Sequence, residues 1–333
     1  MAKPLALTSG EPAGIGPDIT IKAWLRRNEL KLPAFYWLGD RDLLHNRAKA
    51  LGVEVELAEV RAEDAIDTFA DALPVVATGH TATARPGQPD ETSANAAVAS
   101  IRQAVDDVIA GRASAVVTNP IAKSVLYRAG FRHPGHTEFL AELADGGHAP
   151  QPVMMLWSPA LVVVPVTIHL SLREAIAQLS SDLIVSTARI VVADLKARFG
   201  LAKPRLAVSG LNPHAGEDGS LGTEDQTIIA PAIEILRRDG IAIRGPLPAD
   251  TMFHDAARKT YDCAICMYHD QALIPVKTLA FEDAVNVTLG LPFVRTSPDH
   301  GTAFDIAGTG KANPSSLIAA LRLAARMTTP PPP

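Results

Sequence analysis

Three histidines stand where the chain could bind a metal ion. His169, His214 and His269 each follow an apolar run that is typical of a buried β-strand, and imidazole is a common ligand of divalent cations. The three runs are 161–168, 205–209 and 263–268. Ligands of open α/β sheets bind beyond the carboxyl ends of the strands. We therefore interpret the trio as candidate ligands of one divalent cation; the alternative is that each is an ordinary loop or capping residue.

A second group of residues could bind an anionic substrate. His136 and Thr137 stand at the expected start of a helix, with Thr137 as its N-cap, and a helix N-terminus favours an anion. Lys277 and Asn286 precede Arg295, whose guanidinium can bind a phosphate or carboxylate through two parallel hydrogen bonds. Taken singly, each of these residues is more often a helix cap or a surface charge.

Two glycine-containing segments lie near the two ends of the chain. Residues 297–314 combine three glycines with a His-Gly pair and an Asn-Pro pair, which favours a shaped ligand-binding loop. Residues 9–20 read Ser-Gly-Glu-Pro-Ala-Gly-Ile-Gly-Pro-Asp-Ile-Thr, between an apolar run and a helical pattern. Their glycine spacing fits neither the dinucleotide fingerprint nor the P-loop. Asp18 also puts a negative charge where an anionic phosphate would otherwise dock.

The elements that must position these residues alternate along the chain. Short apolar runs separated by longer helical patterns predict βαβ units and a largely parallel sheet. The expected strands are 5–8, 34–38, 73–77, 115–118, 153–156, 161–168, 205–209 and 263–268. The expected helices include 19–26, 96–110, 137–144, 171–178, 182–199, 225–239 and 314–327. Residues 78–93 are rich in Gly, Pro, Thr and Ala and are expected to form an exposed loop.

Composition and charge exclude several classes of protein. The 333 residues suffice for two lobes with a sizeable core. A net charge of -5 gives no basic footprint for nucleic acid, and the longest apolar runs are too short for a membrane helix. Because the chain has only two cysteines and starts without the apolar region of a signal peptide, we expect a cytoplasmic protein.

Six motifs together resemble one enzyme family. They are Gly-Glu-Pro-Ala-Gly-Ile-Gly-Pro at 10–17, Gly-His-Thr-Glu-Phe at 135–139, Leu-Asn-Pro-His-Ala-Gly at 211–216, Gly-Pro-Leu-Pro-Ala-Asp at 245–250, Met-Tyr-His-Asp-Gln at 267–271 and Asn-Val-Thr-Leu-Gly-Leu-Pro-Phe-Val-Arg-Thr at 286–296. With the 297–314 loop, they make the chain similar to the 4-hydroxythreonine-4-phosphate dehydrogenases, a family of the isocitrate/isopropylmalate dehydrogenase-like superfamily. The chain departs in reading Thr118-Asn-Pro120 where the family has Thr-Gly-Pro or Thr-Ala-Pro, and in having Glu11 where Asp is common.

The resemblance implies an α/β, two-lobed isocitrate/isopropylmalate dehydrogenase-like fold, with mainly parallel sheets and an active-site cleft between the lobes. Residues 1–125 plus 275–333 would form the cofactor-side lobe, and residues 126–274 the metal, substrate and dimerisation lobe. It also implies a homodimer whose metal site is shared between subunits, with His269 contributed across the interface.

The implied reaction is the NAD- or NADP-dependent oxidation of 4-phosphooxy-L-threonine. The product, 2-amino-3-oxo-4-phosphooxybutanoate, would lose CO₂ to give 3-amino-2-oxopropyl phosphate on the route to pyridoxine 5'-phosphate, a form of vitamin B6. By this resemblance, the metal ligands are His169, His214 and His269, and the substrate-binding residues are His136, Thr137, Lys277, Asn286 and Arg295. Imidazole ligands favour zinc or cobalt over magnesium, and manganese is a further candidate.

The cofactor and the catalytic base are placed less directly. The superfamily loop that wraps the adenosine corresponds to 299–313, so the 9–20 segment is expected near the reacting end of the cofactor. The candidate cofactor-binding residues are Gly14, Gly16, His300, Gly301, Asp305, Gly308 and Asn313. Asp250 and Asp270 are candidate catalytic bases, or alternatively residues that orient the histidines.

Two rival functions stay open. Relatives with the same histidines act on threonate or erythronate phosphate or on aromatic cis-dihydrodiols. A protein that binds metal and ligand without catalysis is the other alternative.

Overall fold

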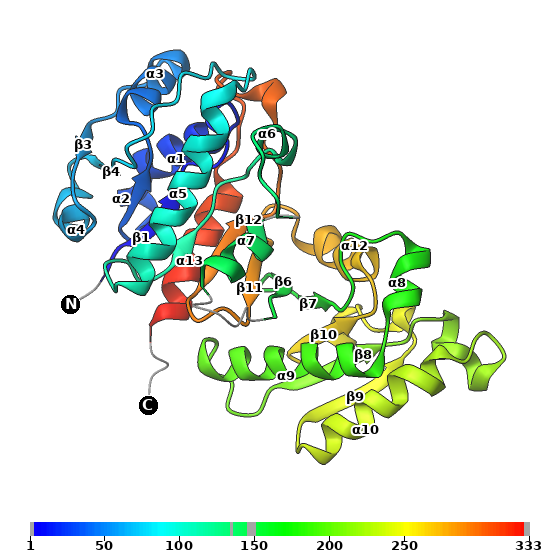
Figure 1. Cartoon of the computed structure of the whole chain (residues 1–333). Helices are drawn as coiled ribbons and strands as arrows, with labels where there is room; N and C mark the ends of the chain where they lie inside the picture. Colours follow the sequence, from blue (N-terminus) through cyan, green and yellow to red (C-terminus); the bar gives the residue numbers. More distant parts are fainter. Residues whose placement is uncertain (1–2, 134–135, 145–150, 330–333) are drawn as a thin grey trace. The chain divides into compact units, whose positions relative to one another are not determined.

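The computed structural model describes residues 3–133, 136–144 and 151–329, which form two compact units (Figure 1). Unit 1 comprises Met1–Pro152 together with Leu291–Thr329, and unit 2 runs from Val153 to Gly290. The two ends of the chain therefore belong to one unit, and the middle forms the other. We expected the boundaries at 125/126 and 274/275. The boundaries lie later because α7 (His136–Leu143) packs with α5 (Glu91–Ile109) of unit 1, whereas α12 (His269–Ala280) packs with strands of unit 2.

Unit 1 is built on a parallel sheet with the strand order β3-β4-β2-β1-β5-β12. The strands are β1 (Leu5–Thr8), β2 (Phe35–Leu38), β3 (Leu57–Glu59), β4 (Leu73–Val76), β5 (Val116–Val117) and β12 (Arg295–Pro298). Every residue of β1 and β2 is buried, as in a sheet covered by helices on both faces. The pairing of β12 with β5 places the last of these strands beside residues that precede it by about 180 positions.

Helices and short turns complete unit 1. They are α1 (Gly16–Leu25), α2 (Arg27–Leu30), α3 (Arg41–Leu51), η1 (Ala62–Asp64), α4 (Ala65–Thr68), α5, α6 (Lys123–Arg128), α7, η5 (Phe304–Ile306) and α13 (Ser315–Thr328). The long helix α5 begins where Asp90 accepts hydrogen bonds from the amides of Thr92 and Ser93, while the Ser93 hydroxyl accepts from the amide of Asp90. This capping box satisfies amides that a helix start leaves without partners. The loop expected over 78–93 forms mostly neither helix nor strand up to residue 90, but residues 91–93 begin α5.

Unit 2 contains a mixed sheet with the strand order β11-β6-β7-β10-β8-β9. The strands are β6 (Val153–Trp157), β7 (Val162–Pro165), β8 (Arg205–Ser209), β9 (Ala242–Leu247), β10 (Cys263–Cys266) and β11 (Val285–Leu289). β7, β10, β8 and β9 run parallel to one another, whereas β6 is antiparallel to both β11 and β7. The carboxyl ends of β7, β10 and β8 therefore meet at one edge of the sheet, which is where ligands bind in such sheets.

The remaining elements of unit 2 are helices and turns. They are α8 (Leu172–Gln178), α9 (Ser181–Ala197), η2 (Pro213–Gly219), η3 (Asp225–Ile229), α10 (Ala230–Arg238), η4 (Ala249–Thr251), α11 (Asp255–Arg258) and α12. Among the described residues, no single helix is long and apolar enough to cross a membrane; α8 and α9 meet that criterion only as a pair bent by 89°.

Candidate active site

Two of the three predicted metal ligands lie side by side in unit 2. The ring centroids of His169 and His269 are 5.8 Å apart. Thr167 brings them together, because its hydroxyl donates a 2.8 Å hydrogen bond to the carbonyl of Met267 and so ties the end of β7 to the end of β10. Both histidines line a concavity of about 220 Å³ between α8 and the start of α12. His169 has a φ of 54°, a left-handed conformation that is strained for a residue with a β-carbon.

Asp270 orients one of these imidazoles. Its Oδ1 lies 2.7 Å from Nδ1 of His269, and a carboxylate can only accept at that contact. In the neutral ring Nδ1 therefore carries the proton, and Nε2 keeps the lone pair that can bind a metal ion. Of the two proposed bases, Asp270 thus contacts a predicted ligand. Asp250 is an exposed residue of η4.

His214 lies in a strained turn that follows β8. The backbone is left-handed from His214 to Asp218, with φ values between 40° and 83°. For a residue with a β-carbon, this conformation is unfavourable by roughly 1–2 kcal/mol of conformational free energy. Of the five residues, only Gly216 has no β-carbon and adopts it without that cost. Residues held in such conformations cluster at functional sites, where the surrounding structure over-determines them. The strained backbone therefore indicates that the segment containing His214 belongs to a functional site.

Asp225 holds this turn in place. Its buried carboxylate accepts hydrogen bonds from the amides of Leu211 and Asn212 at 2.9 and 3.1 Å, and from Nδ2 of Asn212 at 3.0 Å. Asp225 begins η3, a π-helical turn of a kind that is frequent at functional sites.

Gln271 joins the same turn to the strand end that carries His269. Its Nε2 donates to the carbonyl of Gly210 at 2.8 Å, while its Oε1 accepts from the hydroxyl of Ser209 and from the amide of Met267. The ends of β8 and β10 are therefore held by one side chain. Within the described ranges, however, no three His, Cys, Asp or Glu side chains are arranged as a complete metal site.

The predicted substrate residues occur in both units. Arg295, on β12 of unit 1, is only 3% exposed, and its Nη2 donates a 2.6 Å hydrogen bond to the hydroxyl of Thr118. Lys277 on α12 and Asn286 on β11 belong to unit 2 and are half-buried. In unit 2, the ammonium of Lys277 lies 6.0 Å from the ring centroid of Phe281.

The helix α7 differs slightly from the expectation. It begins at His136, so Thr137 lies within its first turn and is not its N-cap. A one-residue difference at a helix end is common, because the cap itself has non-helical geometry. The side chain of His136 and all of Gly135 lie outside the described residues.

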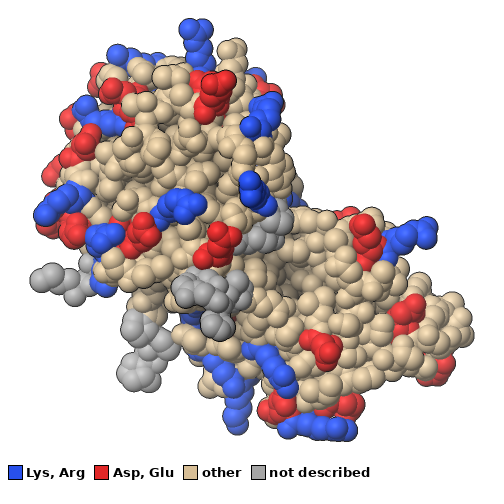
Figure 2. All heavy atoms as spheres, in the orientation of Figure 1, with Lys and Arg blue, Asp and Glu red and all other residues tan. Residues whose placement is uncertain are grey.

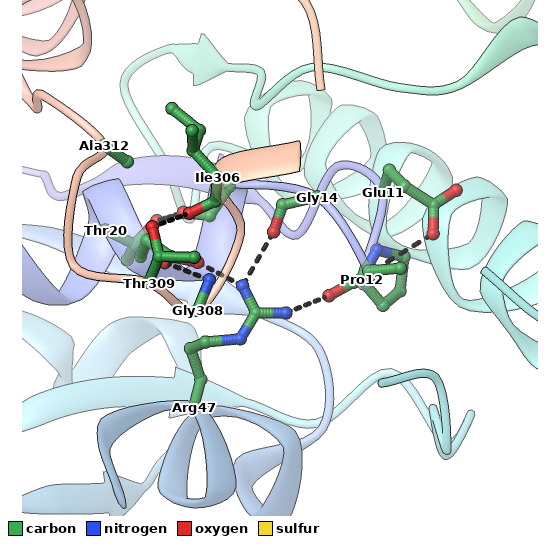
Figure 3. Close-up of polar contacts among 12 residues, drawn as sticks. Glu11, Pro12, Gly14, Thr20, Arg47, Ile306, Gly308, Thr309 and Ala312 are labelled. Carbon is green, nitrogen blue, oxygen red and sulfur yellow. Dashed lines mark hydrogen bonds and ion pairs between the residues drawn. The ribbon is translucent and has the colours of Figure 1, made fainter. Parts of the chain in front are cut away.

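The two glycine-containing segments meet within unit 1 (Figure 3). We call residues 9–18 the opening loop and residues 299–313 the closing loop. The amide of Ile15 donates to the carbonyl of Thr302 at 3.0 Å, and the amide of Gly308 donates to Oδ1 of Asp18 at 2.7 Å. A β-carbon at Gly14 would lie 3.0 Å from the carbonyl oxygen of Thr302, so glycine permits this approach. The negative charge of Asp18, which we expected to repel a phosphate, is paired with Arg47.

The other predicted cofactor residues lie along these two loops. Gly16 begins α1, and Asp305 is exposed in η5. Asn313 accepts hydrogen bonds from the amide and hydroxyl of Ser315 at the start of α13. Gly301 is exposed, and its carbonyl accepts a 3.0 Å hydrogen bond from Nδ1 of His300.

His300 carries a feature that suits a ligand. Because Nδ1 donates to a carbonyl, Nε2 is an acceptor in the neutral ring. This Nε2 is buried and has no hydrogen-bond partner among the described residues. A buried acceptor without a donor is unfavourable, so the closing loop offers a position for a ligand hydroxyl or amino group.

Glu11 adds a buried carboxyl to the opening loop. It is 1% exposed, and its Oε1 accepts a 3.1 Å hydrogen bond from the amide of Ala13. Burial raises the pKa of Glu11, and the nearby Asp90 carboxylate adds to that increase.

Charges are mixed on the face of the molecule drawn in Figure 2. Lysine and arginine side chains alternate there with aspartate and glutamate, and they form no continuous basic surface on that face.

Comparison with known proteins identifies the family. The family model described as "Pyridoxal phosphate biosynthetic protein PdxA" matches residues 31–324. The chain belongs to the PdxA family. A relative from Bradyrhizobium diazoefficiens, named 4-hydroxythreonine-4-phosphate dehydrogenase, is 76% identical over 335 residues, which cover 98% of this chain and 97% of the relative.

Two solved structures resemble this PdxA-family chain. The 4-hydroxythreonine-4-phosphate dehydrogenase of Klebsiella pneumoniae is 36% identical, with coverage of 98% of this chain and 100% of the other, and a TM-score of 0.86. A terephthalate 1,2-cis-dihydrodiol dehydrogenase of Burkholderia xenovorans is 30% identical, with coverage of 98% of both chains and a TM-score of 0.66. The predicted α/β fold is confirmed by these comparisons.

Sequence reasoning missed three residues that position the site of this PdxA-family chain. Gln271 ends the Met-Tyr-His-Asp-Gln motif at 267–271, so its position next to His269 and Asp270 could have identified it as a residue of the site. Asp225 and Arg47 carry no such signal, because their partners lie many residues away in the sequence.

Proposed function

We propose that this chain is a metal- and nicotinamide-dependent dehydrogenase that oxidises 4-phosphooxy-L-threonine to 2-amino-3-oxo-4-phosphooxybutanoate, which decarboxylates to 3-amino-2-oxopropyl phosphate. The observation that carries the proposal is the adjacency of His169 and His269 at neighbouring strand ends, with Asp270 fixing the second ring. Membership of the PdxA family and the names of its relatives support the choice of substrate.

The donor set fits a divalent metal ion. His169 and His269 would supply two nitrogen ligands, and His214, on its strained turn, is the proposed third. The bound metal would supply Lewis acidity, which lowers the pKa of a coordinated hydroxyl. The ring of His269 lies 5.8 Å from that of His169 in the same chain. That a homodimer shares the metal site, with His269 contributed across the interface, stays part of the proposal.

The buried guanidinium of Arg295 would anchor the phosphate or carboxylate of the substrate. Thr118 holds the guanidinium through one Nη2 hydrogen bond, which fixes the direction in which the group points. A nearly buried cation binds an anion more strongly than an exposed one, because solvent screens it less. His136, Thr137, Lys277 and Asn286 complete the proposed substrate-binding set, and Asp250 is the proposed base that accepts the hydroxyl proton.

The opening and closing loops fit the nicotinamide cofactor, which would accept the hydride. The buried Nε2 of His300 would accept a hydrogen bond from a ribose hydroxyl or from the adenine amino group. Gly14, Gly16, Gly301, Asp305, Gly308 and Asn313 are the other proposed cofactor-binding residues.

An exposed apolar surface on unit 2 supports a homodimer. Leu172 and Ile176 on α8 are 62% and 46% exposed, and Ile274 on α12 is 65% exposed. Leu172 lines the histidine concavity, and Ile274 lies one helical turn beyond Asp270. Clustered exposed apolar side chains mark interaction sites. We propose that a second copy covers this surface and closes the metal site.

The decisive experiment is turnover of 4-phosphooxy-L-threonine with NAD⁺ and with NADP⁺, measured after metal removal and after adding back zinc, cobalt, magnesium or manganese. We expect activity with one dinucleotide that disappears with the metal and returns with it. Erythronate 4-phosphate and a phosphate-free aromatic cis-dihydrodiol are assayed in parallel. Faster turnover of the dihydrodiol would contradict the phosphorylated substrate, and binding of every ligand without NADH or NADPH formation would contradict catalysis.

A further inference from the structure

A buried ion pair in unit 1 joins the end of the opening loop to α3, whose Arg47 is labelled in Figure 3. Arg47, in the middle of α3, is 2% exposed, and Asp18, in the first turn of α1, is fully buried. The guanidinium of Arg47 forms an ion pair with the carboxylate of Asp18 through Nη1 and Oδ2.

The other polar contacts of this pair go to the backbone of the two loops. Nη1 of Arg47 donates to the carbonyl of Gly14 at 2.7 Å, and Nη2 donates to the carbonyl of Pro12 at 2.9 Å. Oδ1 of Asp18 accepts the amide of Gly308 at 2.7 Å. One guanidinium and one carboxylate therefore connect α3, the opening loop and the closing loop.

Stability alone is a weak reason for such a pair. A buried ion pair adds little folding stability compared with well-packed apolar side chains, because the free-energy cost of removing two charges from water offsets their mutual attraction. An apolar pair, however, would leave the two carbonyls and the Gly308 amide without their partners. What Arg47 and Asp18 supply is a fixed geometry for the loop backbone.

Other contacts hold the closing loop on either side of Gly308, but they do not hold Gly308 itself. Lys22 on α1, which is half-buried, donates to the carbonyls of Gly310 and Ala312, so it holds the far part of the closing loop. The amide of Ile15 holds Thr302. Gly308 lies between these two attachments, and Asp18 accepts its amide.

We propose that Arg47 and Asp18 are positioning residues for the nicotinamide cofactor: they hold the closing loop in its binding conformation before the cofactor arrives. The proposal rests on the proposed function in one respect, namely that the cofactor binds at these loops. When the loop is already ordered, the free energy of cofactor binding is not reduced by the entropy cost of ordering it. Loss of the ion pair should therefore weaken cofactor binding more than it slows the chemical step.

The test compares Arg47→Met, Arg47→Lys and Asp18→Asn with the wild type. Dissociation constants of NAD⁺ and NADP⁺ are measured by calorimetric titration, and kcat is measured at saturating cofactor. We expect Arg47→Met to raise the dissociation constant of the preferred dinucleotide about tenfold or more, with kcat within about twofold. Arg47→Lys should fall between, because lysine keeps the charge and lacks the planar fork.

The matched control is Arg61→Met. Arg61 pairs with Asp64 in the same unit, but this pair is on the surface, with side chains 78% and 52% exposed. It should leave the dissociation constants unchanged.

Hydrogen exchange supplies a readout that needs no cofactor. In Arg47→Met the amides of 301–310 should exchange faster than in the wild type, whereas Arg61→Met should leave them unchanged. Unchanged exchange together with an unchanged dissociation constant in a folded Arg47→Met variant would overturn the proposal. If Arg47→Met does not fold, the same two measurements on Arg47→Lys and Asp18→Asn decide. A wild type that binds neither dinucleotide would instead contradict the proposed function, and the exchange comparison would still test the loop clamp.

Discussion

The carboxylate of Asp270 lies 2.7 Å from Nδ1 of His269, so the ring of a predicted metal ligand is held by the next residue in the chain. This contact leads to the first prediction. Asp270→Asn should lower metal affinity about 10–100-fold, because an amide holds the tautomer and orientation of the imidazole less firmly. Metal titration with a competing chelator measures the change. Asp283→Asn, in an exposed loop of the same unit, is the control, and equal affinities for the two variants would contradict the orienting role.

The turn that carries His214 depends on Asp225. Asp225→Ala removes the acceptor of two backbone amides, and each buried donor without a partner costs about 1–3 kcal/mol. We expect the free energy of unfolding to fall by about 2–4 kcal/mol and the bound metal to decrease. Asp225→Asn keeps one acceptor oxygen and should lie between. Urea unfolding and metal analysis check both effects; wild-type metal content in Asp225→Ala would show that the turn does not position a ligand.

Arg295 should act through binding. Arg295→Ala is expected to raise KM for the phosphorylated substrate at least about tenfold while changing kcat little. Thr118→Val removes only the hydroxyl that accepts from Nη2 and should have a smaller effect of the same kind. Steady-state kinetics of the two variants decides. A lower kcat with an unchanged KM in Arg295→Ala would contradict a role of Arg295 in substrate binding.

The raised pKa of Glu11 predicts a pH-dependent stability. A carboxyl whose pKa is higher in the folded state contributes stability that is fully present below its ordinary pKa of 4.5. That contribution is lost as the pH rises through the raised value. Since glutamine does not ionise, the free energy of unfolding of Glu11→Gln relative to wild type should increase as the pH rises above 4.5.

Urea unfolding at several pH values measures this difference. Glu54→Gln, at an exposed position of unit 1, is the control and should show no such trend. A relative stability of Glu11→Gln that stays constant with pH would mean that the buried carboxyl does not titrate in this range.

The apolar surface of unit 2 should mediate dimerisation. Ile274→Asp places a charge on α12 at a side chain that is 65% exposed, and we expect the dimer to dissociate at about tenfold higher concentration or more. Ile109→Asp is matched in type and exposure, at 60% on α5 of unit 1, and should leave the dimer intact. Sedimentation velocity over a dilution series distinguishes them. A dimer equally stable in both variants would place the interface elsewhere.

The strands that are buried on both faces were predictable from sequence. β1 and β8 have the expected bounds, because continuous apolar runs report burial directly. β12 was missed because it reads Arg-Thr-Ser-Pro, although all four residues are buried. The helix α12 was not predicted because it contains Pro275, and proline inside a helical pattern usually ends the helix.

The site was predictable only in part, for a physical reason. The places of His169 and His269 follow from strand ends, which are local features. The left-handed turn around His214 has no local signal, since four of its five residues carry β-carbons. The Arg47–Asp18 pair depends on how α3 packs on α1, so neither residue reveals it alone.

The discontinuity of unit 1 also bears on how the chain folds during synthesis. Unit 2 is one continuous segment, so it can fold as soon as residue 290 has left the ribosome. Unit 1 has to wait, because β12 completes its sheet and the amide of Gly308 completes the contacts of Asp18. The earlier segment of unit 1 would thus reach its native state after unit 2, and until then the exposed edge of β5 would be open to chaperone binding or to pairing with a wrong strand.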